Sequence, residues 1–339
     1  MSHDSPLDAA FDGYEIDILA ALLFRFLSDE VLKMAQPADL PAANQRPSLL
    51  VRAFFFATGC FAVFLCSPSQ ADENFALWPD LAPGETTREA GTELPRRDGE
   101  TPPITRIEKI TSPTFTVHRP KPPNGTGVVI LPGGGFGKVV PGLEGTEAAD
   151  WLAQQGITSF VVSYRTTTDS NTPGWKKPLQ DAQRMIARVR HEAKKYELQV
   201  DRIGLLGFSA GGQVAARLLS DRGNLAYQPL DAIDKVSHRP NFAILVYPWR
   251  MFDANTEGLA EGISVRDDCP PTFLVHTHDD ASTSLGAVLF YAGLKKHSIA
   301  SELHIYGNGG HGYGLRPRPN SQISSWTDHA SHWLSRNGW

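Results

Sequence analysis

The chain has 339 residues, of which 41% are hydrophobic and 20% are charged, and its net charge is −5. This is ordinary globular composition, and the length suffices for one large α/β core. A nucleic-acid-binding role is not expected, because binding to phosphates requires a basic face. Cys60 and Cys66 lie in one apolar run and Cys269 stands alone, so we expect neither an intrachain disulfide in the body of the protein nor a zinc site.

Residues 46–71 have the pattern of a signal peptide. Arg46 and Arg52 precede an apolar run at residues 53–66, and the small residues Ser69 and Ala71 follow it, which predicts cleavage after Ala71. The run is shorter than the roughly 20 apolar residues of a membrane-spanning helix. We therefore expect an exported protein, periplasmic or extracellular, whose mature chain does not insert into a membrane. A buried core helix is the alternative interpretation of this run.

Residues 1–45 stand in front of the predicted signal as an unusual extension. Between residues 16 and 27, apolar side chains recur at helical spacing on one face. Either the gene start is assigned too early, or the segment is a cytoplasmic amphipathic helix, and both interpretations stay open.

Residues 72–123 are rich in Pro, Gly, Thr and charged residues, which predicts mostly loop with one short strand near residues 115–118. Residues 124–339 alternate short apolar strands with helical patterns. Strands are expected at residues 128–131, 158–163, 203–207, 242–247, 272–276 and 302–306. Helices are expected at residues 146–155, 178–196, directly after 209, 284–297 and 321–335. This alternation predicts one α/β domain with a mostly parallel central sheet and helices on both faces.

The clearest chemical motif is the segment GFSAG at residues 207–211. It follows a predicted buried strand and opens a helix, which is the context of the G-x-S-x-G nucleophile elbow of the α/β-hydrolase fold. Such a turn projects the hydroxyl of Ser209, and the helix N-terminus places the Ala210 N–H near a developing oxyanion. We predict Ser209 as the nucleophile; a Gly-rich turn without chemistry is the alternative.

A second glycine-rich segment, PGGGF at residues 132–136, directly follows the first strand of the predicted domain. In the α/β-hydrolase fold, a loop after an early strand supplies an oxyanion donor and is often written HGGG, whereas here Pro132 stands in the place of the His. Glycine amides can approach an ester oxygen without a Cβ in the way. We predict Gly134 and Gly135 as donors beside Ala210. A phosphate-binding loop is the alternative, but neither G-K-[ST] nor a dinucleotide fingerprint is present.

The general base is predicted to be His311, which lies between glycines just after the last strand. The order of the triad in this fold is Ser, acid, His, with the His beyond the final strand. His304 lies within that strand and is expected to be structural. The acid should follow the preceding strand, where Asp279 and Asp280 are both candidates.

The segment that holds these two carboxylates also contains H-x-H-x-D at residues 276–280, the pattern of half a binuclear zinc site. A full site would place another His directly after the Asp, but Ala281 stands there. We therefore expect no bound metal.

Together these motifs resemble a known family, the secreted bacterial α/β hydrolases similar to acetyl xylan esterases and BD-FAE-type esterases. The resemblance covers residues 128–314 and is carried by residues 132–137, 163–165, 178–184, 201–212, 271–280 and 309–314. It implies hydrolysis of short acyl esters, especially acetyl groups on xylan-type sugars, without cofactor or metal. In the resembled pattern the acid lies four residues after the terminal His of the strand, which selects Asp280. Residues 281–283 and the absence of Leu after Arg165 depart from that pattern, so the sugar specificity stays open.

The sequence thus predicts a serine esterase that uses Ser209, His311 and Asp280 and acts on a small ester or an acetylated polysaccharide. Phe136, Trp249 and Tyr313 are candidates for lining the substrate pocket, with core packing as the alternative for each. Two other functions are alternatives: a serine peptidase of the prolyl-oligopeptidase kind, and a catalytically inactive carbohydrate-binding protein. Residues 72–123 are too few for the propeller that such a peptidase usually carries. The sequence gives no indication of the oligomeric state.

Overall fold

The structure is a computed structural model that describes residues 74–167 and 171–339. The predicted signal peptide and the extension before it lie outside the described residues. Within the part that is described, no helix is both long enough and apolar enough to span a membrane.

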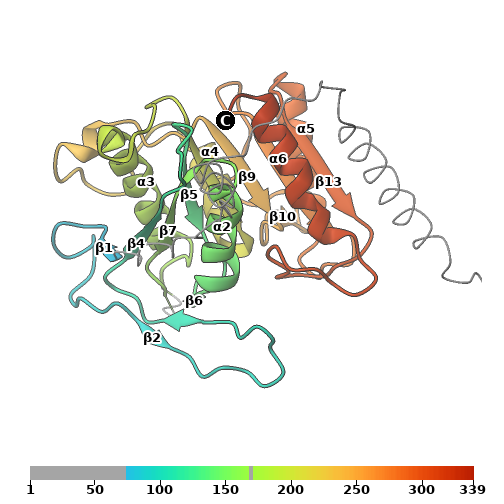
Figure 1. Cartoon of the computed structure of the whole chain (residues 1–339), viewed down its shortest axis with the longest axis horizontal. Helices are drawn as coiled ribbons and strands as arrows, with labels where there is room; N and C mark the ends of the chain where they lie inside the picture. Colours follow the sequence, from blue (N-terminus) through green and yellow to red (C-terminus); the bar gives the residue numbers. More distant parts are fainter. Residues whose placement is uncertain (1–73, 168–170) are drawn as a thin grey trace, which may run out of the picture. The chain divides into compact units, whose positions relative to one another are not determined.

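An eight-stranded sheet organises these residues, in the order β1-β4-β7-β5-β8-β9-β12-β13 (Figure 1). The bounds are β1 (Asn74–Ala76), β4 (Thr114–His118), β5 (Gly127–Leu131), β7 (Thr158–Ser163), β8 (Ile203–Phe208), β9 (Phe242–Val246), β12 (Thr272–Thr277) and β13 (Glu302–Tyr306). Strand β4 pairs antiparallel with β1 and β7, whereas every pair from β7 through to β13 is parallel. The carboxyl ends of the parallel strands therefore meet at one edge of the sheet, where open α/β sheets bind ligands.

Helices cover both faces of this sheet. Their bounds are α2 (Glu147–Ala153), α3 (Lys176–His191), α4 (Ser209–Ser220), α5 (Leu285–Lys296) and α6 (Trp326–Arg336). Val129 and Leu131 of β5 pack in one core cluster with α3, α4 and α5, and their neighbours Val128 and Ile130 pack in a second cluster with α2 and α6. Figure 1 shows α2 and α6 in front of the strands. Burial on both faces explains why β5 is apolar throughout, and the predicted α/β fold with helices on both faces is confirmed.

The segment before β5 is mostly loop, and the strand expected near residues 115–118 is β4. The segment before β5 contributes more to the core than its composition suggests, because its residues Leu77, Trp78 and Ile110 are buried. Strand β1 extends the main sheet beyond β4.

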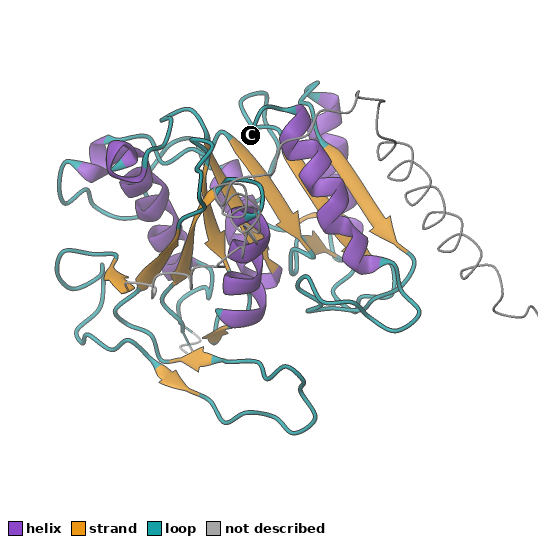
Figure 2. Ribbon diagram, viewed as in Figure 1, coloured by secondary structure: helices purple, strands orange, loops and turns teal. Residues whose placement is uncertain are grey.

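Several short elements escaped the sequence analysis. Figure 2 shows β2 (Thr92–Glu93), β3 (Ile107–Glu108) and β6 (Lys138–Val139), which form a separate three-stranded sheet. The others are the hairpin β10 (Phe252–Asp253) and β11 (Gly258–Leu259), the one-turn π-helix η2 (Gly142–Thr146), and the 3₁₀ helices η3 (Ala193–Tyr196), η4 (Ile233–Lys235) and η5 (Ile323–Ser325). Strands of two residues and isolated single helical turns carry too little periodicity for a sequence pattern to reveal.

Candidate active site

Ser209 lies at the sharp turn between β8 and α4. Its φ of +49° is in the left-handed region, which costs free energy for a residue with a side chain. The turn is tight: a Cβ on Gly211 would lie 2.1 Å from the Leu131 carbonyl oxygen, and one on Gly207 would lie 2.6 Å from the Gly211 carbonyl oxygen. Both flanking positions therefore require glycine, which is the physical basis of the G-x-S-x-G pattern.

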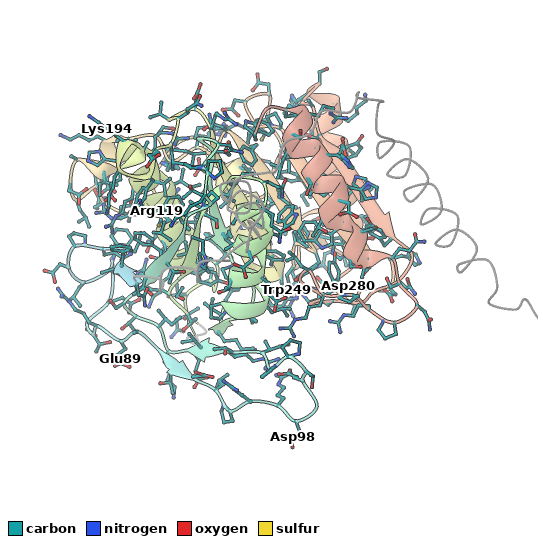
Figure 3. All side chains as sticks on the ribbon, viewed as in Figure 1. Glu89, Asp98, Arg119, Lys194, Trp249 and Asp280 are labelled. Atoms are coloured by element: carbon teal, nitrogen blue, oxygen red, sulfur yellow. The ribbon has the colours of Figure 1, made fainter. Side chains whose placement is uncertain are left out.

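Ser209, His311 and Asp280 form a continuous hydrogen-bonded chain. The Ser209 Oγ lies 2.7 Å from the His311 Nε2, and the His311 Nδ1 lies 2.5 Å from the Asp280 Oδ2. The three residues follow β8, β13 and β12, so all lie at the carboxyl edge of the sheet, where Figure 3 labels Asp280. The His311 side chain is 33% exposed, whereas Asp280 is buried, so the imidazole faces solvent and its partner does not.

Asp280 is held by more than the imidazole of His311. The backbone N–H of Ser282 donates to its Oδ1 at 2.7 Å, and the Nδ1 of the buried His276 lies 3.8 Å from its Oδ2. Burial alone would raise the pKa of Asp280, but the hydrogen bonds from His311 and Ser282 outweigh it and leave that pKa below its ordinary value. Burial lowers the pKa of His276, against the opposing effect of Asp280, so His276 is neutral near pH 7. The carboxylate therefore remains ionised beside His311.

Asp279, the alternative acid, has a different set of partners. It is exposed and accepts hydrogen bonds from the backbone N–H groups of Gly310 at 2.9 Å and Gly309 at 3.2 Å. These bonds, that from Gly310 first, lower the pKa of Asp279. Asp279 thus anchors the histidine loop, which we define as residues 307–314. The imidazole of His311 is hydrogen-bonded to Asp280 instead.

The oxyanion loop, defined as residues 132–137, is anchored on both sides. The Gly133 N–H donates to the Glu144 Oε2 at 2.6 Å, and the Gly133 carbonyl oxygen accepts from the Val140 N–H at 3.1 Å. The Tyr164 hydroxyl donates to the Pro132 carbonyl oxygen at 2.5 Å. The start of the loop is therefore held by three hydrogen bonds.

Two of the predicted oxyanion donors, Gly134 and Gly135, come directly after this anchored start of the loop. Within the described residues, the amides of Gly134 and Gly135 donate no hydrogen bond. A Cβ on Gly134 would lie 2.1 Å from the Lys138 carbonyl oxygen, while the space around Gly135, with φ +67°, is open. Ala210 is the second residue of α4, where a backbone N–H has no partner within the helix. None of these three amides donates a hydrogen bond within the described residues, although Ala210 is buried.

The three candidate substrate residues lie in two different environments in the structure. The Trp249 N–H donates to the Ser209 carbonyl oxygen at 2.9 Å, and the Trp249 ring meets the Phe136 ring edge-on with centroids 5.7 Å apart. Tyr313 is only 1% exposed, and its ring packs on Tyr247 in the core. This burial favours the core-packing alternative for Tyr313 over a place in the substrate pocket.

The sequence analysis missed two residues behind the triad, Glu144 and Tyr247. Glu144 lies in η2 and is buried, and its Oε1 accepts a hydrogen bond from the Tyr247 hydroxyl at 2.7 Å. Burial raises the pKa of Glu144, although the hydrogen bonds from Tyr247 and Gly133 act in the opposite direction. No motif marks this pair; the one available signal was a lone carboxylate in the otherwise uncharged turn before α2.

The H-x-H-x-D segment does not build a cluster of ligands. His276 is buried and His278 is exposed. Among the described residues, no group of three or more His, Cys, Asp or Glu side chains is placed to hold a metal ion.

Comparison with known proteins shows which family the chain resembles. The BD-FAE family model matches residues 115–227. The acetylxylan esterase of Xylanibacter ruminicola is 28% identical over 220 residues, which are 58% of this chain and 42% of that protein. The crystal structure of an acetyl ester-xyloside bifunctional hydrolase from Caldicellulosiruptor lactoaceticus matches with a TM-score of 0.59 and 28% identity, over 78% of this chain and 96% of that one. The chain is an α/β hydrolase similar to the BD-FAE family.

Two further matches show how much of the chain and of its relatives this similarity covers. The endo-1,4-beta-xylanase B of Butyrivibrio fibrisolvens is 28% identical over 204 residues, 55% of this chain and 32% of that protein. This α/β hydrolase thus spans less than half the length of both curated relatives. MGS-M1, an α/β hydrolase from a Medee basin deep-sea metagenome library, matches with a TM-score of 0.57 and 21% identity, over 80% of this chain and 98% of that one, and supports the fold alone. The family resemblance predicted from the motifs is confirmed.

Proposed function

We propose that this α/β hydrolase is a serine esterase that removes short acyl groups, in particular acetyl groups, from xylan-type carbohydrates. The observation that carries the proposal is the chain Ser209–His311–Asp280, with contacts of 2.7 and 2.5 Å, beside amides that donate to no other group in the described part of the chain. Nucleophile, base and orienting acid are within hydrogen-bonding reach, as nucleophilic catalysis requires. An acetylxylan esterase and an acetyl ester-xyloside hydrolase among its relatives support the choice of acyl group and sugar.

The proposed mechanism proceeds through an acyl-enzyme. The Ser209 Oγ attacks the ester carbonyl carbon while the His311 Nε2 takes its proton, and Asp280 stabilises the resulting imidazolium. The His311 proton then passes to the departing alcohol, and a water molecule, activated by the same imidazole, hydrolyses the acyl-enzyme.

The developing oxyanion would be stabilised by the amides of Ala210, Gly134 and Gly135. Loss of one such donor costs a factor of about 10² to 10³ in kcat in comparable sites. Positioning of this loop therefore contributes to the rate in addition to the triad.

Phe136 and Trp249 are proposed to border the acyl group or the sugar. The backbone of Trp249 is bonded directly to that of Ser209, and its indole is half-buried, so an apolar face lies close to the nucleophile. Aromatic side chains offer such a face together with a polar edge.

A substrate panel tests the proposal. It comprises p-nitrophenyl acetate, butyrate and octanoate, acetylated xylan, a feruloyl ester and a proline peptide, each assayed with wild type and with S209A. We expect acetyl esters to be hydrolysed fastest and S209A to be inactive at unchanged folded yield. Cleavage of the peptide alone, rapid hydrolysis of octanoate, or S209A activity above about a tenth of wild type would each contradict the proposal, since the nucleophile normally supplies far more than tenfold.

Export is proposed from the signal pattern at residues 46–71. Mass spectrometry of the protein from the periplasm or medium should find a mature N-terminus at Asp72 or within a few residues of it. An intact Met1 in exported protein would contradict this.

A further inference from the structure

A second buried carboxylate lies behind the triad and takes no part in the mechanism above. Glu144 is 4% exposed, and both of its oxygens accept hydrogen bonds, Oε2 from the Gly133 N–H at 2.6 Å and Oε1 from the Tyr247 hydroxyl at 2.7 Å. It projects from η2, and single turns of π-helix are frequent at functional sites.

Tyr247 continues the connection to the other side of the site. Its hydroxyl oxygen accepts a hydrogen bond from the Gly314 N–H at 2.9 Å, at the end of the histidine loop. Its ring lies edge-on to that of His311, with centroids 5.0 Å apart. One carboxylate and one phenol therefore join the oxyanion loop to the histidine loop.

The Gly133 end of this connection lies directly against the nucleophile. A Cβ on Gly133 would lie 2.7 Å from the Ser209 Cβ and 2.7 Å from the Glu144 Oε2. Because Gly133 immediately precedes the two candidate donors, its position determines where the amides of Gly134 and Gly135 point.

An apolar residue could not replace Glu144 without consequence. The Gly133 N–H and the Tyr247 hydroxyl would both be left buried without their acceptor, and a buried polar group without a partner is costly. A buried carboxylate that is fully hydrogen-bonded, in contrast, restricts both loops to one geometry.

We propose that Glu144 and Tyr247 are positioning residues, which hold the oxyanion loop and the histidine loop in register with Ser209. The inference rests on the proposed function, because it assigns the pair a part in the same reaction. It predicts that loss of the pair slows the chemical step and leaves substrate binding nearly unchanged.

The test compares E144A, E144Q and Y247F with wild type, using p-nitrophenyl acetate and active-site titration with a fluorophosphonate. We expect kcat per titrated Ser209 to fall about 100-fold in E144A and about tenfold in Y247F, with KM changed less than about threefold, since a misplaced group costs kcat first. E144Q should recover about tenfold over E144A, because its amide oxygen can still accept the Gly133 N–H.

Tyr227 offers a matched control. Its buried hydroxyl donates to the Asp234 Oδ1, also at 2.7 Å, and within the described residues neither residue is hydrogen-bonded to Ser209, His311 or Asp280. Y227F should lower the melting temperature as Y247F does, yet leave kcat and KM unchanged.

The inference is overturned if kcat per titrated site stays within about threefold of wild type in Y247F and in E144A. If E144A does not fold, Y247F and E144Q decide by the same criterion. If the wild type hydrolyses no ester, the proposed function fails by itself, and the rate of phosphonylation of Ser209 becomes the readout. A rate about tenfold lower in Y247F than in Y227F then supports the positioning role, and equal rates overturn it.

Discussion

At the scale of single residues, two adjacent carboxylates have separate partners. Asp280 is buried and bonded to the His311 Nδ1, whereas Asp279 is exposed and bonded to the amides of Gly309 and Gly310. The first is placed to hold the imidazole in one tautomer, and the second to hold the backbone that carries it.

This division predicts different outcomes for the two amide substitutions. D280N should lower kcat by about 10⁴ near neutral pH, because an amide favours the wrong tautomer of His311. D279N should lower it less than about tenfold, since the amide oxygen of Asn still accepts one backbone N–H. Steady-state kinetics at equal folded yield measures both; the reverse ranking would move the acid to Asp279.

Glu144 leads to a prediction about stability and pH. Burial raises the pKa of Glu144 in the folded protein above that in the unfolded chain. The stabilisation from binding this proton is fully present below the unfolded pKa and is lost as pH rises through the folded pKa. Glutamine does not titrate, so the melting temperature of E144Q relative to wild type should rise as the pH increases above the ordinary pKa of a glutamic acid.

Thermal unfolding of both proteins at several pH values measures this difference. The titratable groups that face Glu144 are Tyr164, Tyr247, Tyr313 and His311. All four are present in wild type and E144Q, so the comparison isolates the carboxyl group of Glu144. A difference that is constant or falls with pH would contradict the prediction.

At the scale of elements, the elbow depends on how closely α4 approaches β5. A Cβ on Gly211 would lie 2.1 Å from the Leu131 carbonyl oxygen, which belongs to backbone in the centre of the sheet and cannot move aside. The two elements are far apart in sequence, yet their contact determines which residue the elbow can carry.

G211A should therefore destabilise the fold strongly. An overpacked site of this kind costs about 3 kcal/mol, which lowers the melting temperature of a domain of this size by about 6–12 °C. Gly142 provides the comparison, because a Cβ there meets nothing within 4 Å and its φ is not positive. A melting temperature of G211A as high as that of G142A would show that β5 and α4 can separate.

At the scale of the whole molecule, the loop-rich segment before β5 is tied to the hydrolase core by aromatic and ionic contacts. The Trp78 Nε1 donates to the Asp181 Oδ1 at 2.8 Å, and its ring lies beneath the guanidinium groups of Arg165 and Arg184. Arg165 and Asp181 form an ion pair with both side chains fully buried, and Arg165 also donates to the Pro83 carbonyl oxygen at 2.7 Å. The segment is thus an integral part of the folded unit.

W78A should show this directly. Removing a buried Trp costs about 3–5 kcal/mol, or about 6–20 °C in melting temperature for a domain of this size. Leu81, in the same segment, is 41% exposed, so L81A should have little effect. Equal melting temperatures for the two variants in a thermal denaturation series would mean that the segment does not support the core.

The sequence by itself determined the order of the main strands and helices, the α/β fold and the candidate motifs around Ser209 and His311. Apolar runs bounded by glycines reveal these elements, because a strand that is buried on both faces of a parallel sheet requires consecutive apolar residues. The residues alone left Asp279 and Asp280 open, and only the resemblance to a family selected Asp280.

Only the tertiary structure decided which side chains meet. Tyr313 turns into the core although it lies beside His311 in sequence, Trp78 packs on α3 from a segment that reads as loop, and Glu144 reaches both Gly133 and Tyr247. Apart from that between Gly133 and Glu144, these contacts join segments that are distant in the chain. Which residues meet in these contacts depends on the direction in which a side chain leaves its turn. Packing determines that direction, and no local sequence pattern predicts it.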